Sequence, residues 1–230
     1  MAQSDEYWNQ FYLKSSFNQG PPRVNAPVPF LVNQLERLSK GKALDIGMGE
    51  GINAVYLAKN GFSVKGFDLS QTAIEHALAL AKETGVSIET RQVDLDLFLF
   101  GLLEYDTVLM SYFKPPLVRY YSEIIRTLKQ GGTLLVESFM IDEIKEPIAP
   151  DESYRDYYYR PNELLQNLRG LRILFYQEGM VDGKCVVQCL AQKPVDRDAA
   201  KYDLFNMQSG PKEIGPTIHQ KLAEQLFKKK

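Results

Sequence analysis

Acidic and glycine residues between positions 43 and 51 have the spacing of a ligand-binding turn. The stretch reads Ala-Leu-Asp-Ile-Gly-Met-Gly-Glu-Gly, and helix-spaced apolar residues follow from Ile52. This pattern predicts a buried strand, a tight turn and the start of a helix. Glycine lets the backbone approach a ligand closely, and the free N–H groups of a helix start attract a polar or negatively charged group. The turn is therefore the first candidate for a binding site.

A second acid, Asp68, ends the next apolar run, 19 residues after Gly49. At a separation of about 20 residues, an acid in a doubly wound sheet reaches the ribose of a bound nucleotide. One carboxylate can accept hydrogen bonds from both ribose hydroxyls. The alternative is that Asp68 only caps the following helix, but Ser70 can serve as that cap.

The pattern D-x-G-x-G-x-G, formed by Asp45, Gly47, Gly49 and Gly51, resembles motif I of the class I S-adenosylmethionine-dependent methyltransferases. A dinucleotide fingerprint, G-x-G-x-x-G, would need glycine where Ile52 stands, so a nicotinamide cofactor is disfavoured. The resemblance covers roughly residues 30–193. It implies S-adenosyl-L-methionine as cofactor and S-adenosyl-L-homocysteine as product.

The remaining elements must bring these residues to one edge of a sheet. Strand and helix patterns alternate up to residue 138, and two last strands flank a turn at 181–183. We therefore expect a doubly wound, mostly parallel α/β sheet of seven strands, the Rossmann-like methyltransferase fold, with a terminal antiparallel hairpin. We also expect a helix over 70–82 and a turn at 131–132 before a strand over 133–138. The buried stripe predicted for that helix is Ile74, Ala77, Leu78 and Ala81.

Three regions follow from the change in composition along the chain: an aromatic N-terminal arm or lid at 1–30, the cofactor-binding domain at 31–193, and a helical tail at 194–230. Ligands of doubly wound sheets bind beyond the carboxyl ends of the strands. The resemblance implies that the glycine loop and Ser111 face the methionine part, that Asp68 binds the ribose, and that Asp94 reads the adenine amino group, with Asp96 as the alternative. The predicted cofactor-binding residues are Asp45, Gly47, Met48, Gly49, Gly51, Asp68, Leu69, Asp94, Leu95 and Ser111.

An acceptor pocket is expected between the aromatic arm and the segment 139–160, which is too long for a plain connector. Tyr112 and Arg160 are the candidate catalytic residues. The alternative is that the arm only covers the core and that the arginines pair with the nearby acids of residues 151–156. The predicted substrate-pocket residues are Tyr7, Trp8, Tyr12, Tyr112, Arg155 and Arg160.

The sequence offers no well-placed histidine for proton transfer, because His76 lies off the buried stripe and His219 falls in the tail. A thiolate, selenide or tellurium nucleophile needs no general base, whereas a hydroxyl or amine acceptor usually does. The segment 111–138, with its Gly131-Gly132 pair, and the segment 159–164 also resemble small-molecule enzymes of the tellurite-resistance and thiopurine methyltransferase group. Residues 111–116 lack the [N/D]-P-P-[Y/F] pattern of DNA amino-group methyltransferases.

We therefore predict in-line methyl transfer to a small molecule with a soft S, Se or Te nucleophile or an oxyanion, driven mainly by proximity and orientation. One alternative is a methyltransferase acting on an O or N acceptor, in a small metabolite or a protein. Another is a non-catalytic S-adenosylmethionine-binding protein, whose mark would be a damaged glycine loop.

The composition of the chain limits the kinds of partner that it is expected to bind. The net charge of −2 does not indicate nucleic-acid binding, and no apolar run has membrane length. Cys185 and Cys189 fall four apart on a predicted strand, too far for a disulfide. We expect a cytoplasmic monomer or homodimer with a small-molecule methyl acceptor, no nucleic-acid or membrane partner and no metal.

Overall fold

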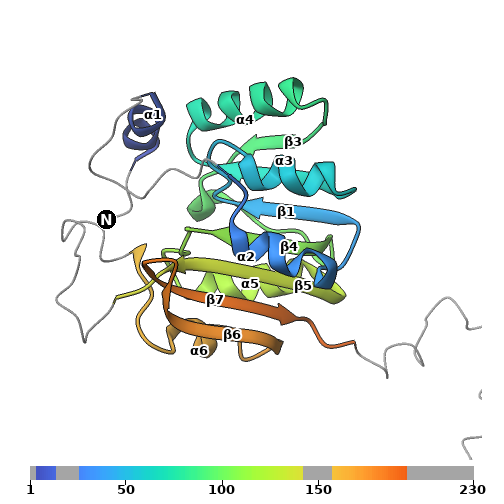
Figure 1. Ribbon diagram of the computed structural model, residues 1–230, viewed down its shortest axis with the longest axis vertical. Helices are drawn as coiled ribbons and strands as arrows, with labels where there is room; N and C mark the ends of the chain where they lie inside the picture. Colours follow the sequence, from blue (N-terminus) through green and yellow to red (C-terminus); the bar gives the residue numbers. More distant parts are fainter. Residues whose placement is uncertain (1–3, 14–25, 142–156, 196–230) are drawn as a thin grey trace, which may run out of the picture. The chain divides into compact units, whose positions relative to one another are not determined.

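Figure 1 shows the computed structural model of the chain, which describes residues 4–13, 26–141 and 157–195. Its centre is a seven-stranded sheet in the order β3-β2-β1-β4-β5-β7-β6. Neighbouring strands are parallel except around β7, which is antiparallel to both β5 and β6. The predicted fold, a mostly parallel sheet closed by an antiparallel hairpin, is confirmed. The strands are β1 (Lys42–Ile46), β2 (Ser63–Asp68), β3 (Glu89–Gln92), β4 (Tyr105–Ser111), β5 (Leu128–Phe139), β6 (Arg172–Val181) and β7 (Lys184–Gln192).

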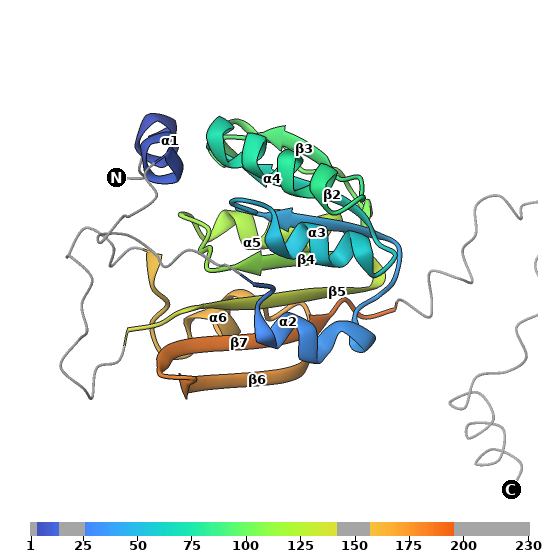
Figure 2. The ribbon, with the colours of Figure 1, turned by 45° about the horizontal axis from the view of Figure 1, so that its top comes forward.

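Helices cover both faces of this sheet (Figures 1 and 2). The core on one face is formed with α2, α3 and α4, and the core on the other face with α5 and α6. Alternate residues of the central strand β4 enter these two cores, which explains why Val108, Leu109 and Met110 are all fully buried. The helices are α1 (Asp5–Leu13), α2 (Pro29–Gln34), α3 (Ile52–Lys59), α4 (Gln71–Glu83), α5 (Arg119–Thr127) and α6 (Glu163–Asn167), with 3₁₀ turns η1 (Leu35–Arg37) and η2 (Leu95–Leu97).

Helix α4 follows its predicted pattern with one exception. The Ser70 hydroxyl accepts a hydrogen bond from the Ala73 N–H at 3.1 Å, so Ser70 is the N-cap. Ile74, Ala77 and Ala81 are buried, but Leu78 is exposed, and the prediction for Leu78 was wrong. Small residues let α4 approach the sheet closely along a narrow stripe, and a side chain one position further round the helix falls outside it.

The predicted turn at 131–132 is also corrected. Strand β5 runs from Leu128 to Phe139 without a break, and its pairing with β4 slips between Leu128 and Thr133. The extra residues form an irregularity inside the strand, with Gly131 at a φ of +76°. The last hairpin turns at Asp182 and Gly183, both with positive φ, as the sequence predicted.

Parts of several sequence predictions lie outside the described residues: Arg155, most of the segment 139–160, residues 14–25 of the arm and the tail from 196 onward. Within the described ranges, no helix combines the length and the apolarity needed to cross a bilayer.

Candidate cofactor and acceptor site

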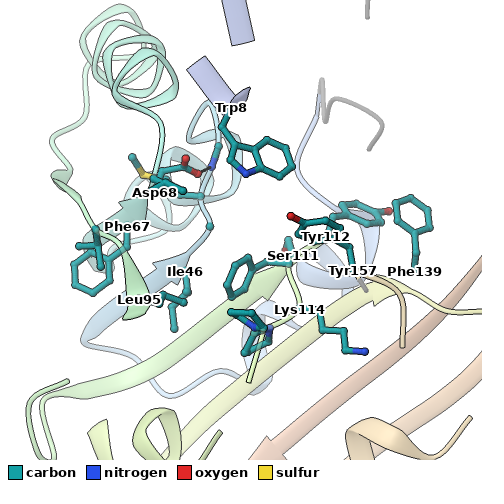
Figure 3. Close-up of a pocket in the computed structure, with 18 of the residues that line it drawn as sticks. Trp8, Ile46, Phe67, Asp68, Leu95, Ser111, Tyr112, Lys114, Phe139 and Tyr157 are labelled. Carbon is teal, nitrogen blue, oxygen red and sulfur yellow. Dashed lines mark hydrogen bonds between the residues drawn. The ribbon is translucent and has the colours of Figure 1, made fainter. Parts of the chain in front are cut away.

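The carboxyl ends of β1, β2 and β4 open into a cavity of about 1010 Å³ (Figure 3). Helix α1 and residues 157–166 form other parts of its wall. Small-molecule sites commonly measure about 300–1,000 Å³. The cavity therefore has room for a cofactor and a second small molecule.

The glycines of the first loop have different roles. Gly47 and Gly49 line the cavity with φ values of +68° and +55°. A Cβ atom on Gly47 would lie 2.8 Å from the Phe113 ring, and one on Gly49 would lie 2.9 Å from the Tyr12 hydroxyl. Gly51 is not part of the lining, and a Cβ there would lie 2.5 Å from the Cβ of Ala77. Gly51 therefore lets α3 pack against α4, and its predicted approach to a ligand does not match its position.

Asp68 fixes the shape of this loop. Its Oδ2 accepts a hydrogen bond from the Gly49 N–H at 2.8 Å, and its Oδ1 accepts one from the Ser70 N–H at 2.8 Å. Burial raises the pKa of Asp68, although these backbone hydrogen bonds oppose the shift. Asp68 also lines the cavity beside Leu69, as predicted, so one carboxylate can both organise the loop and face a ligand.

Asp45 and Ser111 have buried side-chain oxygens without a hydrogen-bond partner in the part of the chain that the structure describes. Asp45 is buried just outside the lining, and neither of its carboxylate oxygens has a hydrogen-bond partner among the described residues. Burial, and then the charge of Asp68, raise the pKa of Asp45 to about 7. The Ser111 hydroxyl, which lines the cavity, is likewise buried without a partner. Native structures rarely leave such groups unpaired, so both favour a polar ligand at this end of the cavity.

The two acids after β3 can be told apart. The Asp94 Oδ1 accepts a hydrogen bond from the Asp96 N–H at 2.9 Å, and Leu95 lies between them on the cavity wall. The Asp96 carboxylate accepts a hydrogen bond from the Tyr120 hydroxyl and lies 3.4 Å from a guanidinium nitrogen of Arg119. Because the Asp96 carboxylate already interacts with Tyr120 and Arg119, the Asp94 carboxylate is better placed to accept a hydrogen bond from a ligand.

Helix α1 closes another side of the cavity. Trp8 and Tyr12 line it, whereas Tyr7 does not and packs edge-on against Trp8, with ring centroids 5.3 Å apart. The Asn9 Oδ1 fastens α1 to the start of α4, accepting hydrogen bonds from the Ser70 hydroxyl at 2.7 Å and the Thr72 N–H at 3.2 Å. The sequence analysis missed Asn9, although a polar residue among the aromatic residues of the arm was a usable signal.

Tyr112 lies at the tip of β4 with a φ of +52°. Its N–H donates to the Glu137 backbone oxygen, and its hydroxyl donates to Glu137 Oε1, both at 2.7 Å. Its ring stacks on Phe139 with centroids 4.7 Å apart. The hydroxyl is therefore already engaged, and the catalytic role of Tyr112 stays a prediction. Glu137 was missed, although a lone acid in an apolar strand was a signal.

Two cations line the cavity near residues 157–163. The Lys114 ammonium donates to the Tyr158 carbonyl and to the Glu163 carboxylate, each at 2.9 Å, and thereby ties the β4 tip to this segment. Arg160 is exposed, and its guanidinium has no partner among the described residues. Tyr157 joins the segment to α1, since its ring lies 6.1 Å from that of Trp8. None of the described lining residues is a histidine.

Known proteins share this domain. Residues 43–132 match the family model described as "Methyltransferase domain". A ubiquinone biosynthesis O-methyltransferase of Rickettsia canadensis is 34% identical over 109 residues, 46% of this chain and 45% of the relative. A 2-heptyl-1-hydroxyquinolin-4(1H)-one methyltransferase of Mycobacteroides abscessus is 30% identical over 146 residues, 56% of this chain and 64% of the relative. The chain thus spans about half to two thirds of the length of these two relatives.

Solved structures share the fold. A structure from work on the conversion of a disulfide bond into a thioacetal group during echinomycin biosynthesis superimposes with a TM-score of 0.65 at 24% identity, over 86% of this chain and 96% of that one. The seven-stranded fold, the D-x-G-x-G-x-G turn and the family match agree with one another. The chain therefore contains a class I S-adenosylmethionine-dependent methyltransferase domain, an enzyme domain whose cofactor is S-adenosyl-L-methionine.

Proposed function

We propose that this chain methylates a small, flat acceptor whose nucleophile reaches the cavity as an anion, either a thiolate or heavier chalcogen anion or an oxyanion such as a phenolate. The observation that carries this proposal is the composition of the cavity wall. The aromatic rings of Trp8, Phe139 and Tyr157 line the cavity, together with the cations Lys114 and Arg160.

The part of the lining that would hold the cofactor, formed by Gly47, Gly49, Asp68, Asp94 and Ser111 and called here the cofactor half, supports the same conclusion. The bound cofactor supplies a methyl group on a sulfonium, which is ready for in-line displacement. The unpaired oxygens of Asp45 and the hydroxyl of Ser111 would hold its methionine part, and Asp68 and Asp94 the ribose and the adenine. Gly47 and Gly49 line the cavity with positive φ values, and the absence of their Cβ atoms lets Phe113 and Tyr12 pack against the loop.

The protein residues of the acceptor half orient the acceptor and exclude water. Flat rings hold a planar molecule at little entropic cost, and Trp8 with Tyr157 would separate it from solvent. A nearby cation favours the ionised form of a thiol or phenol, so Arg160 would keep the nucleophile deprotonated, whereas the Lys114 charge is already paired with Glu163. Such an acceptor needs no histidine as general base.

Oxygen is the acceptor atom favoured by the names of the relatives. One relative is an O-methyltransferase of ubiquinone biosynthesis, and the other is named for a hydroxylated quinolone that carries a heptyl chain. Sulfur remains the second candidate, because a thiolate suits the same cationic, aromatic wall.

A product screen tests the proposal. The purified chain is incubated with S-adenosylmethionine and matched sets of phenols, aromatic thiols, chalcogen oxyanions and amines, and methylated products are detected by mass spectrometry. We expect methylation of phenols or thiols, with a rate that rises with pH until the acceptor is ionised. Methylation of amines alone would contradict the proposal. Binding of S-adenosylmethionine without transfer to any acceptor would favour a non-catalytic role.

A further inference from the structure

The methyltransferase domain carries an exposed aliphatic surface that the chemistry above does not use. We call it the leucine rim; its members are Leu97, Leu99, Leu102, Leu103, Leu117 and Val118. The side chains of Leu97 and Leu99 are each 86% exposed, and that of Val118 is 70% exposed. Scattered exposed leucines are ordinary, but a group of this kind marks an interaction surface.

The rim is held outward by the aromatic residues between its leucines. The connection from β3 to β4 contains the short turn η2 and then an extended segment. Phe98 packs edge-on against Phe67 of the core, with ring centroids 4.9 Å apart, and Phe100 packs against Phe98 at 5.1 Å. Because neighbouring side chains of an extended segment point to opposite sides, anchoring these two rings turns Leu97 and Leu99 toward solvent.

The rim continues into the mouth of the cavity. Leu117 and Val118 line the cavity and are also exposed, so they stand at its edge. The Asp96 carboxylate accepts a hydrogen bond from Tyr120 of α5, which holds η2 beside the start of that helix. The Leu103 N–H donates to the Arg126 carbonyl at 3.0 Å, which holds the end of the same connection beside the last turn of α5.

We propose that the leucine rim docks the mouth of the cavity on a lipid surface, from which an apolar acceptor enters directly. The entry of that acceptor rests on the proposed function, whereas the docking does not. The continuity of the rim with the cavity favours this occupant, because a lipid surface can supply an apolar molecule to the edge that Leu117 and Val118 form. Docking requires only side chains that reach the interface, so it needs no spanning helix, and none of the helices in the described ranges could span a bilayer.

The composition of the rim separates a lipid surface from a protein partner. Protein interfaces are enriched in aromatic residues, methionine and arginine, whereas every member of the rim is aliphatic. Among the described residues the charges beside the rim are mixed: Arg119 pairs with Asp96, Glu104 follows Leu103 in sequence, and Arg91 lies over the Phe98 ring. Docking should therefore depend on burial of aliphatic groups and not on anionic lipids.

The test is sedimentation of the full chain with sucrose-loaded vesicles of pure phosphatidylcholine, at low and high salt. We expect binding that salt does not weaken. The double variant Leu97→Ser/Leu99→Ser should lose about tenfold in partitioning, because both aliphatic groups would no longer enter the interface. Leu78→Ser is the matched control, since it removes an exposed leucine from α4, and it should bind as the wild type does.

Calorimetry with S-adenosylhomocysteine keeps this test separate from the proposed function. The double variant should bind the product with unchanged affinity and should melt at the same temperature as the wild type. Wild-type sedimentation of the double variant would overturn the proposal, as would binding to anionic vesicles alone with loss at high salt. Self-association that the double variant abolishes, without vesicle binding, would assign the rim to a second copy of the chain instead.

Discussion

The cofactor half and the acceptor half of the cavity are built by different means. The cofactor half consists of strand tips and backbone: Gly47 and Gly49 lie on the lining, and Asp68 binds the N–H groups of Gly49 and Ser70. The acceptor half consists of side chains from distant segments, such as Trp8 against Tyr157. The first is fixed by local spacing along two neighbouring strands, whereas the second depends on contacts across the whole chain.

This difference predicts where changes should act. Substitutions in the cofactor half should alter stability and cofactor affinity, because its groups are part of the sheet edge. Substitutions in the acceptor half should alter acceptor binding and leave the cofactor in place. Four predictions, ordered by the size of the expected effect, separate the two halves.

The largest effect should come from Asp45. Its pKa of about 7 lies above the ordinary value of 3.8, so the folded chain keeps a proton that the unfolded chain releases between about pH 4 and 7. Stability should therefore fall as pH rises through this range. Asp45→Asn removes the effect, and its gain in unfolding free energy at pH 8 should approach about 4 kcal/mol.

Urea unfolding of the wild type and of Asp45→Asn at pH 4.5 and pH 8 measures this gain. The two proteins should be nearly equally stable at the lower pH. Saturating S-adenosylmethionine should reduce the difference in unfolding free energy between the two proteins at pH 8, if its ammonium group becomes the partner of the Asp45 carboxylate. Equal stability of the two proteins at both values would show that Asp45 has a partner in the folded chain.

The next largest effect concerns Gly51. Gly51→Ala should cost about 3 kcal/mol of unfolding free energy, because a Cβ would collide with Ala77 and the residue has a φ of +76°. Gly61→Ala is the matched control: its φ is +85°, but a Cβ there meets nothing within 4 Å, so only the backbone strain of about 1–2 kcal/mol remains. Equal costs in thermal unfolding would mean that the packing of α3 against α4 does not require Gly51.

Asp68 should affect cofactor binding. Asp68→Asn keeps one of the two acceptor oxygens that bind the loop N–H groups, sets an NH2 group against the other N–H, and removes the charge that would bind the ribose hydroxyls. Hydrogen bonds to a charged partner contribute about 1.5–3 kcal/mol, so affinity for S-adenosylhomocysteine should fall at least tenfold in calorimetry. Asp96→Asn is the control and should change this affinity less than threefold, since Asp96 is engaged with Tyr120 and Arg119. A larger loss of affinity in Asp96→Asn than in Asp68→Asn would contradict the assignment of Asp68 to the cofactor.

The smallest effect should come from the acceptor wall. Trp8→Ala should raise the KM for a methyl acceptor about fivefold, roughly the loss of one ring contact of about 1 kcal/mol. The dissociation constant of the cofactor should stay within twofold. Tyr7→Ala alters the neighbouring ring of α1, which does not line the cavity, and should leave both constants unchanged. Weakened cofactor binding with an unchanged KM would place Trp8 in the other half.

The same contrast explains how much the sequence could predict. The mostly parallel sheet with its antiparallel hairpin, the Ser70 cap and the positions of Asp68 and Asp94 on the lining follow from spacing within a few tens of residues. The role of Gly51 could not be predicted, because it depends on the approach of Ala77 from another helix.

Side-chain pairs between remote segments could not be predicted from the sequence for the same reason. Lys114 with Glu163 and Tyr112 with Glu137 are joined only when the strands are placed beside one another. Charge and aromatic content predicted the types of group in the acceptor half, and the contacts among them required the structure.

A calorimetric titration of the purified chain with S-adenosylhomocysteine, and separately with NAD, tests the central claim most directly. The geometry of the glycine loop and Asp68 predicts one binding site for S-adenosylhomocysteine and no measurable heat with NAD. The affinity should fall at least tenfold in Asp68→Asn and should persist in Trp8→Ala. Tight binding of NAD with no response to S-adenosylhomocysteine would contradict the account.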